Sequence, residues 1–480
     1  MKLPTTAKAS FWFLFANIFQ KAIMVICTPI FTRLLTKEEF SKFAIFQSWQ
    51  VIFVVFATLN VTNYATAKAL VKFKDDRNVF ILSAQSLLFT LSLLTFGVYC
   101  VVKFVYGGLN QLPFWIMILM FFDIISMGLF TFWSQIERFN NKYKALVFVS
   151  IFTGVLSPAI ALILIVFSDT LELDRSWSRI LGWVIANGII AIVLFGIITK
   201  RSHKLFSVKY WKYCLFYCLP LIPHFLTAAF LQRIGQLVVD KYAGAAMAGV
   251  FALANSLAML MLVFNDAFTK TIVPYTYQKL SDNKANEINS PVKFSLVFIA
   301  SLDVVMTLVA PEIVTIFAGA AYKEAIYAIP PLVAVCYFGF LYNTFANIEY
   351  YYEETVYVSA ASVLAGVLIV ILNFTLVPKF GFLASAYASL ISYIAFAWLH
   401  YYFMKKTIKK HRKGQSVYDN KFIFSVSVAL VLSILFIPLL YQWNIVRYVI
   451  IILACCWILI YRKQLLMSLK SVLTGGKQHE

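Results

Sequence analysis

The sequence predicts an all-α polytopic membrane protein that crosses the bilayer fourteen times. Hydrophobic residues make up 61% of its 480 residues and charged residues only 13%, a balance that is not that of a soluble domain. Apolar runs long enough to cross a bilayer recur from one end of the chain to the other. The expected spans are about 11–32, 43–66, 79–102, 112–135, 145–167, 180–199, 213–235, 246–268, 293–311, 326–348, 356–377, 382–403, 421–441 and 446–461.

The loops between these runs alternate between basic and weakly charged. Most of the 41 Lys and Arg residues fall in the N-terminal segment, in alternate loops and in the C-terminal tail. Because the Lys- and Arg-rich side of a membrane protein faces the cytoplasm, both termini are expected there. The net charge of +20 then belongs to the cytoplasmic face and attracts anionic lipid, so nucleic acid is not an expected partner.

Two charged linkers divide the chain. The stretches 200–204 and 405–413 are rich in basic residues, and each follows a multiple of six predicted spans. Both halves then begin on the same side of the membrane, as parallel structural repeats do. The prediction is an N-terminal six-helix lobe at 1–204 and a C-terminal six-helix lobe at 205–413. An accessory two-helix segment with a cytoplasmic tail follows at 414–480, and its nearly apolar spans favour a packing or partner surface.

A polar stripe runs along the first predicted helix, with a cation near its middle. Offsets of seven and four residues put its members on one helical face. They are Ser10, Asn17, Lys21, Thr28 and Thr32. An ionisable group costs several kcal/mol in hydrocarbon, so Lys21 either faces a cavity or pairs with an acid such as Asp123 for structural reasons alone.

The seventh predicted helix repeats this arrangement. Arg233, Gln236 and Asp240 are three and four residues apart and share a face. Arg233 either faces a cavity or extends toward the nearby membrane interface. Ammonium and guanidinium groups are natural partners for phosphate oxygens, so an anionic group that passes between the halves would meet Lys21 and Arg233.

Each of the other polar residues within the spans has either a functional or a structural interpretation. Asp123, Asp303 and Asp266 are candidates for ion coupling, which needs a carboxylate whose protonation or ligation changes with conformation; each is otherwise a salt-bridge or interface residue. The amides of Gln47, Gln50, Asn343 and Asn347 either bind sugars or hydrogen-bond between helices.

Motifs of enzymes are missing from the sequence. It contains no G-x-x-x-x-G-K-[ST], H-E-x-x-H, CxxC or G-x-S-x-G pattern. The loops are also too short to carry the acid pair of a membrane glycosyltransferase or polymerase. We therefore expect a transporter that uses no cofactor or metal and does not itself hydrolyse nucleotide.

Five short stretches between about residues 5 and 410 carry further motifs. They are Thr28–Phe40, Leu219–His224, Asp240–Ala254, Ala310–Tyr322 and Asn373–Gly381. In this order and spacing they resemble the multidrug/oligosaccharidyl-lipid/polysaccharide exporter superfamily, in its bacterial O-antigen-type polysaccharide flippase branch. Phe40-Ser41 departs from a frequent Tyr-Gly. Glu349 and its neighbours place acids in a loop expected on the cytoplasmic side.

The resemblance implies two six-helix lobes around a central cavity that opens alternately inward and outward. The implied cargo is an oligosaccharide repeat unit on polyprenyl diphosphate, flipped to the outer leaflet of the bacterial inner membrane for O-antigen or capsule assembly. Lys21, Arg233 and Arg33 would meet the diphosphate, and the Asn and Gln stripes would meet sugar. Membrane lipids, and a polysaccharide polymerase and chain-length regulator, are the implied partners.

Three other functions compete with this one. A drug or cation antiporter of the same superfamily would favour an acid-lined cavity. A flippase for a lipid-linked peptidoglycan precursor is the next alternative. A membrane-embedded polymerase or glycosyltransferase is a rival of another class.

Overall fold

The computed structural model describes residues 5–107, 112–140, 142–200, 204–412 and 417–452. The chain forms two compact units, Met1–Leu237 and Val238–Glu480, and all of the regular structure in the described part is helical. The units divide inside one helix, whereas the predicted lobe boundaries at 204 and 413 are based on span counts and stay predictions.

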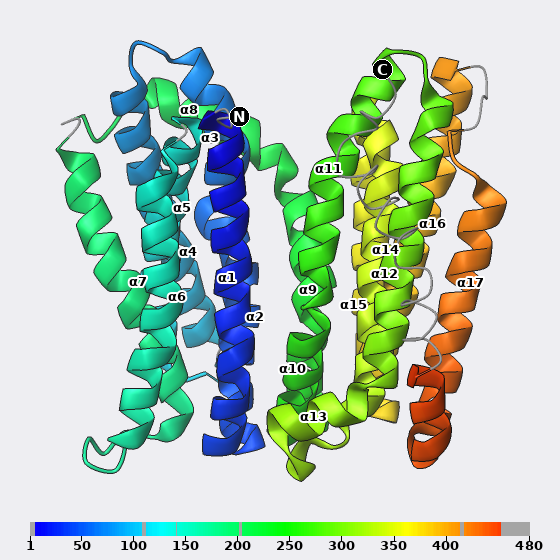
Figure 1. Ribbon diagram of the computed structural model, residues 1–480. Coiled ribbons are helices and arrows are strands. Elements are labelled where there is room, and N and C mark those ends of the chain that lie inside the picture. The colour runs from blue at the N-terminus through cyan, green and yellow to red at the C-terminus, as the bar shows by residue number, and fades with distance from the viewer. Residues whose placement is uncertain (1–4, 108–111, 141, 201–203, 413–416, 453–480) are drawn as a thin grey trace. The chain divides into compact units, whose positions relative to one another are not determined.

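The first unit is a bundle of long helices, drawn in blue, cyan and the first greens of Figure 1. Its strongest pairings are α6 with α7, α1 with α6 and α5 with α7. The helices are α1 (Thr5–Leu34), α2 (Lys37–Thr58), α3 (Val61–Lys72), α4 (Arg77–Tyr106), α5 (Phe114–Phe139), α6 (Tyr143–Val166), α7 (Arg175–Thr199), α8 (Val208–Cys218) and α9 (Ile222–Ala243), whose end enters the second unit.

The second unit is centred on α14, which packs on α10, α11, α12 and α16. Its helices are α10 (Ala245–Ala258), α11 (Met261–Ser281), α12 (Asn289–Leu308), α13 (Ala310–Ala318), α14 (Ala325–Tyr351), α15 (Thr355–Phe380), α16 (Phe382–Arg412) and α17 (Asn420–Phe436), then the 3₁₀ helix η4 (Ile437–Gln442) and a helical stretch from 444 to 452.

The expected fold class is confirmed. Twelve described helices are long and apolar enough to cross a membrane, and they overlap the second to the thirteenth predicted spans. The described apolar part of the first span is Ala22–Leu34, and the fourteenth lies mostly outside the described residues. The count of fourteen and the orientation of the termini therefore stay predictions.

The second predicted span is broken where the sequence suggested one helix. Leu59 and Asn60 both have left-handed backbone conformations, with φ of 48° and 50°, and they separate α2 from α3. Freed backbone groups in a membrane need partners: the Ser92 hydroxyl donates to the Ala57 carbonyl at 3.2 Å, and the Asn60 N–H donates to the Thr58 hydroxyl at 3.2 Å.

Helices α6 and α7 touch backbone to backbone at Gly182. A Cβ atom on Gly182 would lie 2.6 Å from the Ala161 nitrogen and 2.7 Å from the Ser157 carbonyl oxygen. Membrane helices associate through such small residues, because lipid gives apolar side chains no reason to leave it. The absence of a side chain here sets the spacing of the two helices.

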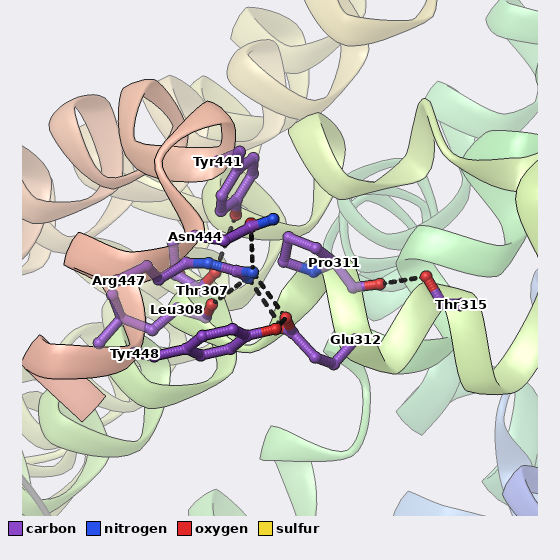
Figure 2. Close-up of polar contacts among 9 residues, drawn as sticks. All are labelled: Thr307, Leu308, Pro311, Glu312, Thr315, Tyr441, Asn444, Arg447 and Tyr448. Atoms are coloured by element: carbon purple, nitrogen blue, oxygen red, sulfur yellow. Dashed lines mark hydrogen bonds and ion pairs between the residues drawn. The ribbon is translucent and has the colours of Figure 1, made fainter. Parts of the chain in front are cut away.

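Polar contacts fasten the described part of the accessory segment to the rest of the second unit at two places. At one end, Lys293 of α12 donates to Asp419, just before α17, at 2.6 Å. At the other end, the fully buried Arg447 donates to both oxygens of Glu312 on α13, at 2.8 and 2.6 Å, and to the Leu308 carbonyl. Figure 2 shows this cluster.

Two tyrosines complete the Arg447 cluster. The Tyr448 hydroxyl donates to Glu312 at 2.7 Å, and Tyr441 donates to the Thr307 carbonyl at 2.8 Å. Glu312 lies outside the candidate membrane spans. Partial burial acts to raise the pKa of Glu312, but hydrogen bonds from Tyr448 and Arg447 outweigh burial and hold the pKa below its usual value.

We predict that Gly182→Ala separates α6 from α7 and lowers stability by roughly 1–3 kcal/mol, because an added methyl group overpacks the contact. The measurement is the melting temperature of the purified protein in detergent. Gly196→Ala is the matched control, since Gly196 lies on the same helix with no atom within 4 Å of its Cβ position. Equal melting temperatures for the two variants would contradict the prediction.

We predict that Arg447→Met lowers stability by about 3 kcal/mol, because it leaves Glu312 without its cation. Since the folded-state pKa of Glu312 is depressed, its contribution exists above the unfolded glutamate pKa of about 4.3. This contribution to stability is lost as the pH falls through the lower pKa that Glu312 has in the folded protein.

Melting temperatures between pH 7 and pH 3 check this. Glu312→Gln should lose part of the acid-induced decrease seen in the wild type. Glu324→Gln, which changes an exposed acid of the same unit, should keep it. A wild-type acid decrease that Glu312→Gln leaves unchanged would show that this carboxylate does not contribute.

Candidate substrate site in the first unit

Five helices of the first unit enclose a cavity of about 250 Å³. Helices α1, α2, α5, α6 and α7 line it, and most of the lining is apolar or aromatic. The polar part of the lining consists of Gln20, Ser126, Thr153, Ser157, Arg179 and Asn187. A small apolar pocket with a few convergent polar groups is the usual form of a ligand site.

Arg179 supplies the positive charge of this lining. Its guanidinium carbon lies 4.3, 4.8 and 4.9 Å from the ring centroids of Phe43, Phe31 and Phe40. Ring faces attract a cation, which allows a guanidinium to remain at an apolar cavity. The N–H edge of such a group binds carboxylate or phosphate oxygens in pairs.

Asp123 lies fully buried behind the same cavity. Trp183 donates to its Oδ2 at 2.9 Å and Asn187 to its Oδ1 at 2.8 Å, and Gln50 of α2 also donates to Oδ2. A buried carboxylate needs this many donors to offset its lost hydration. Because Trp183 and Asn187 also line the cavity, Asp123 fixes how two lining side chains are oriented.

Helix α1 contributes Gln20, which donates to the Ser150 carbonyl of α6 at 3.0 Å. The predicted site residues Asn17 and Lys21 belong to the same helix, but their side chains lie outside what the structure describes. Arg33 is exposed near the end of α1, and Gln47 is partly buried on α2. Of the amides predicted on α2, the structure brings Gln50 to Asp123.

The predicted residues of the seventh span lie on α9. Gln236 is buried, and the Nε atom of Arg233 is buried without a partner among the described residues. The chain passes from one compact unit to the other just after Gln236. Their expected positions at a cavity stay predictions.

The candidates of the second unit are dispersed. Asp303 of α12 is fully buried, and neither carboxylate oxygen has a partner in the described part of the chain. Asp266 is exposed on α11. Asn343 donates to the Gly339 carbonyl of its own helix at 3.0 Å, and Asn347 is buried on the same helix.

The expectation that Glu349 lies in a cytoplasmic loop is wrong. Glu349 is part of α14, is fully buried, and lies 3.0 Å from the Nδ1 atom of His400 on α16. Glu354 does lie in the loop. Hydrogen bonds from Lys410 and His411 hold the pKa of Glu354 below its usual value. This acid therefore pairs with the basic residues at the end of α16.

None of the polar residues that line the cavity was among the predicted site residues, and three lining residues of α7 share one pattern. Arg179, Trp183 and Asn187 recur at every fourth position of α7 and therefore lie on one face. The predicted span began at residue 180, which assigned Arg179 to the preceding loop. A stripe with one cation, one indole and one amide at that spacing was a signal that could have identified this face.

The arrangement can bind an anion beside hydroxyl-bearing groups. Arg179 offers charge, while Asn187, Thr153 and Ser157 offer hydrogen bonds within a largely apolar lining. In the described residues no three His, Cys, Asp or Glu side chains are placed to hold a metal ion. The cavity is thus suited to recognition of a polar, negatively charged ligand.

The chain is similar to a relative in sequence and to a solved structure in fold. A membrane protein of Haemophilus influenzae described as uncharacterized is 22% identical over 369 residues, which is 75% of this chain and 87% of the relative. A lipid II flippase, MurJ, in an inward closed conformation has a TM-score of 0.67 at 16% identity and covers 95% of this chain and 99% of its own.

A second solved structure is similar with a lower TM-score. A multidrug resistance MATE family transporter of the MOP superfamily, in an inward-facing conformation, has a TM-score of 0.58 at 12% identity. It covers 84% of this chain and 96% of its own. Both solved structures have the fold of the exporter superfamily whose motifs the sequence resembles.

A family described as polysaccharide biosynthesis protein matches residues 6–280, more than half of the chain. With the fold and the motif order, this match identifies the chain as a multi-pass membrane transporter of the multidrug/oligosaccharidyl-lipid/polysaccharide exporter superfamily that belongs to the polysaccharide biosynthesis protein family.

Proposed function

We propose that this protein flips polyprenyl-diphosphate-linked oligosaccharide repeat units from the inner to the outer leaflet of a bacterial inner membrane, by alternating access. The product would feed the assembly of O-antigen or another surface polysaccharide. The observation that supports this most directly is Arg179, a cation held by three aromatic rings in a largely apolar cavity whose other polar lining consists of amides and hydroxyls.

Each part of the proposed cargo would contact a different environment, either protein side chains or the bilayer. The diphosphate would bind Arg179 and be met along its path by Lys21, Arg33 and Arg233, since these groups pair with phosphate oxygens. Sugar hydroxyls would bind the side chains of Asn187 and of other cavity residues. The polyprenyl tail would remain in the bilayer, because its transfer from hydrocarbon would be costly.

Energy would come from an ion gradient or from removal of the product. Asp123, Asp303 and Asp266 remain the candidates for ion coupling. Asp303 fits best, because a charged carboxylate buried without a partner is costly, so its burial would depend on its protonation. A polysaccharide polymerase and a chain-length regulator would act on the flipped unit and are proposed as partners.

Charge argues against the antiporter alternative. An exporter of drugs or cations favours an acidic lining, whereas the lining of the described cavity includes Arg179 and no Asp or Glu. The flipping of a peptidoglycan precursor would use a similar anionic group, and the test below separates it from the proposed cargo.

We predict that a strain without this gene loses surface polysaccharide and accumulates lipid-linked repeat units on the inner leaflet. The measurements are polysaccharide gels and leaflet-selective labelling of the lipid-linked units. Normal polysaccharide with altered resistance to cationic dyes would support the antiporter, and growth arrest with lysis would support the peptidoglycan-precursor flippase. Either result would overturn the proposed cargo.

We predict that Arg179→Ala lowers the flipping rate at least tenfold at equal expression, because a hydrogen bond to a charged group is worth about 1.5–3 kcal/mol. Arg179→Lys should retain part of the activity. Arg175→Ala is the matched control on the same helix, since Arg175 forms an exposed pair with Asp169. Lys21→Ala and Arg233→Ala should each weaken transport. Normal transport in these two variants and in Arg179→Ala would refute a cationic path.

A further inference from the structure

An apolar groove runs along the second unit between α14, α16 and α17. It has a volume of about 670 Å³ and is open along one side. The lining includes Phe338 and Leu341 of α14, Trp398 of α16, and Phe424 and Val428 of α17. Trp398 and Phe424 are 63% and 71% exposed, so the open side presents aromatic surface to the surrounding lipid.

The amide and the ammonium of the groove lining lie at one end. Asn420 and Lys421, the first residues of α17, line that end. The Oδ1 atom of Asn420 is buried and has no hydrogen-bond partner in the described part of the chain, while Lys421 is exposed. A buried amide oxygen without a donor is costly, which points to a donor that the chain itself does not supply.

Positive charge gathers at this same end. The ammonium of Lys405 lies 5.2 Å from the ring of Tyr401, which also lines the groove. The nearby acid, Asp419, is already bound to Lys293 and accepts the N–H of Phe422 at the start of α17. The N-terminus of a helix adds a further partial positive charge, so the polar end has a net attraction for anions.

We propose that this groove binds one anionic glycerophospholipid from the leaflet on the side predicted to be cytoplasmic. An acyl chain would lie along Phe338, Trp398 and Phe424, and the phosphate would lie between Lys421 and Lys405. A head-group hydroxyl would donate to Asn420. The groove fits a lipid better than a protein partner. Its long apolar part would hold an acyl chain, and two lysines and an amide oxygen at its end would hold a phosphate head group.

The site is distinct from the candidate substrate site and does not depend on the cargo. All of its residues belong to the second unit, and Arg179 and Asp123 belong to the first. A lipid held here would fill the space between α16 and the accessory segment. The bound lipid would therefore stabilise the position of α17.

The test uses the full-length protein in detergent with phosphatidylglycerol as the probe. Bound lipid is counted by native mass spectrometry, and the melting temperature is followed as lipid is added. We expect one tightly bound phosphatidylglycerol and a rise in melting temperature that phosphatidylcholine does not reproduce.

Two kinds of variant test the charged end and the apolar part of the groove separately. Lys421→Gln with Lys405→Gln should weaken phosphatidylglycerol binding roughly 25-fold, at about fivefold per lysine for a charge near an anionic lipid. Val428→Trp fills the groove, keeps both charges and should abolish the bound lipid. Lys406→Gln is the control, an exposed lysine of α16 whose ammonium lies 5.0 Å from the ring centroid of Tyr357 on α15, which does not line the groove.

Three results would overturn the proposal. Equal binding by phosphatidylcholine would remove the role of the charged end. Unchanged phosphatidylglycerol binding in Val428→Trp and in the double lysine variant would show that the lipid binds elsewhere. Displacement of phosphatidylglycerol by an equal concentration of a polyprenyl phosphate would assign the groove to the tail of the cargo.

Discussion

A polar group that this chain carries into hydrocarbon is costly without a partner, and this constraint determines which helices lie together. Asp123 can remain buried because α2 and α7 each bring N–H donors to it. Glu349 and His400 join α14 to α16 in the same way. The apolar residues around these contacts would pack equally well in lipid, so polar contacts and close backbone approaches select one arrangement among many.

The sequence was sufficient to predict the spans but not their interruptions. Apolar length and loop charge located twelve of the described helices, because hydrophobic burial in a bilayer depends on composition alone. The break at Leu59 and Asn60 was not predictable, since neither residue requires a left-handed backbone. That break depends on Ser92, more than thirty residues away, which provides a donor for a freed carbonyl.

The candidate site was predictable only in part. Periodicity states which residues share a helical face, but it does not state which neighbouring helix that face meets. Gln50 and Asp123 were both identified, yet their contact joins residues 73 positions apart. Arg179 was missed because a span predicted from hydropathy ends where charge begins, whereas the real helix continues past its charged residue with aromatic rings around it.

The contact between Arg447 and Glu312 has a consequence for the biosynthesis of the chain. The two residues are 135 positions apart, and a ribosome adds about 5–20 residues per second. Glu312 therefore reaches the membrane on the order of ten seconds before its cation exists. The second unit can be completed only after the last described helix is made, so a nascent chain that stalls before Arg447 would carry an unmatched carboxylate at its surface, where quality-control proteases could recognise it.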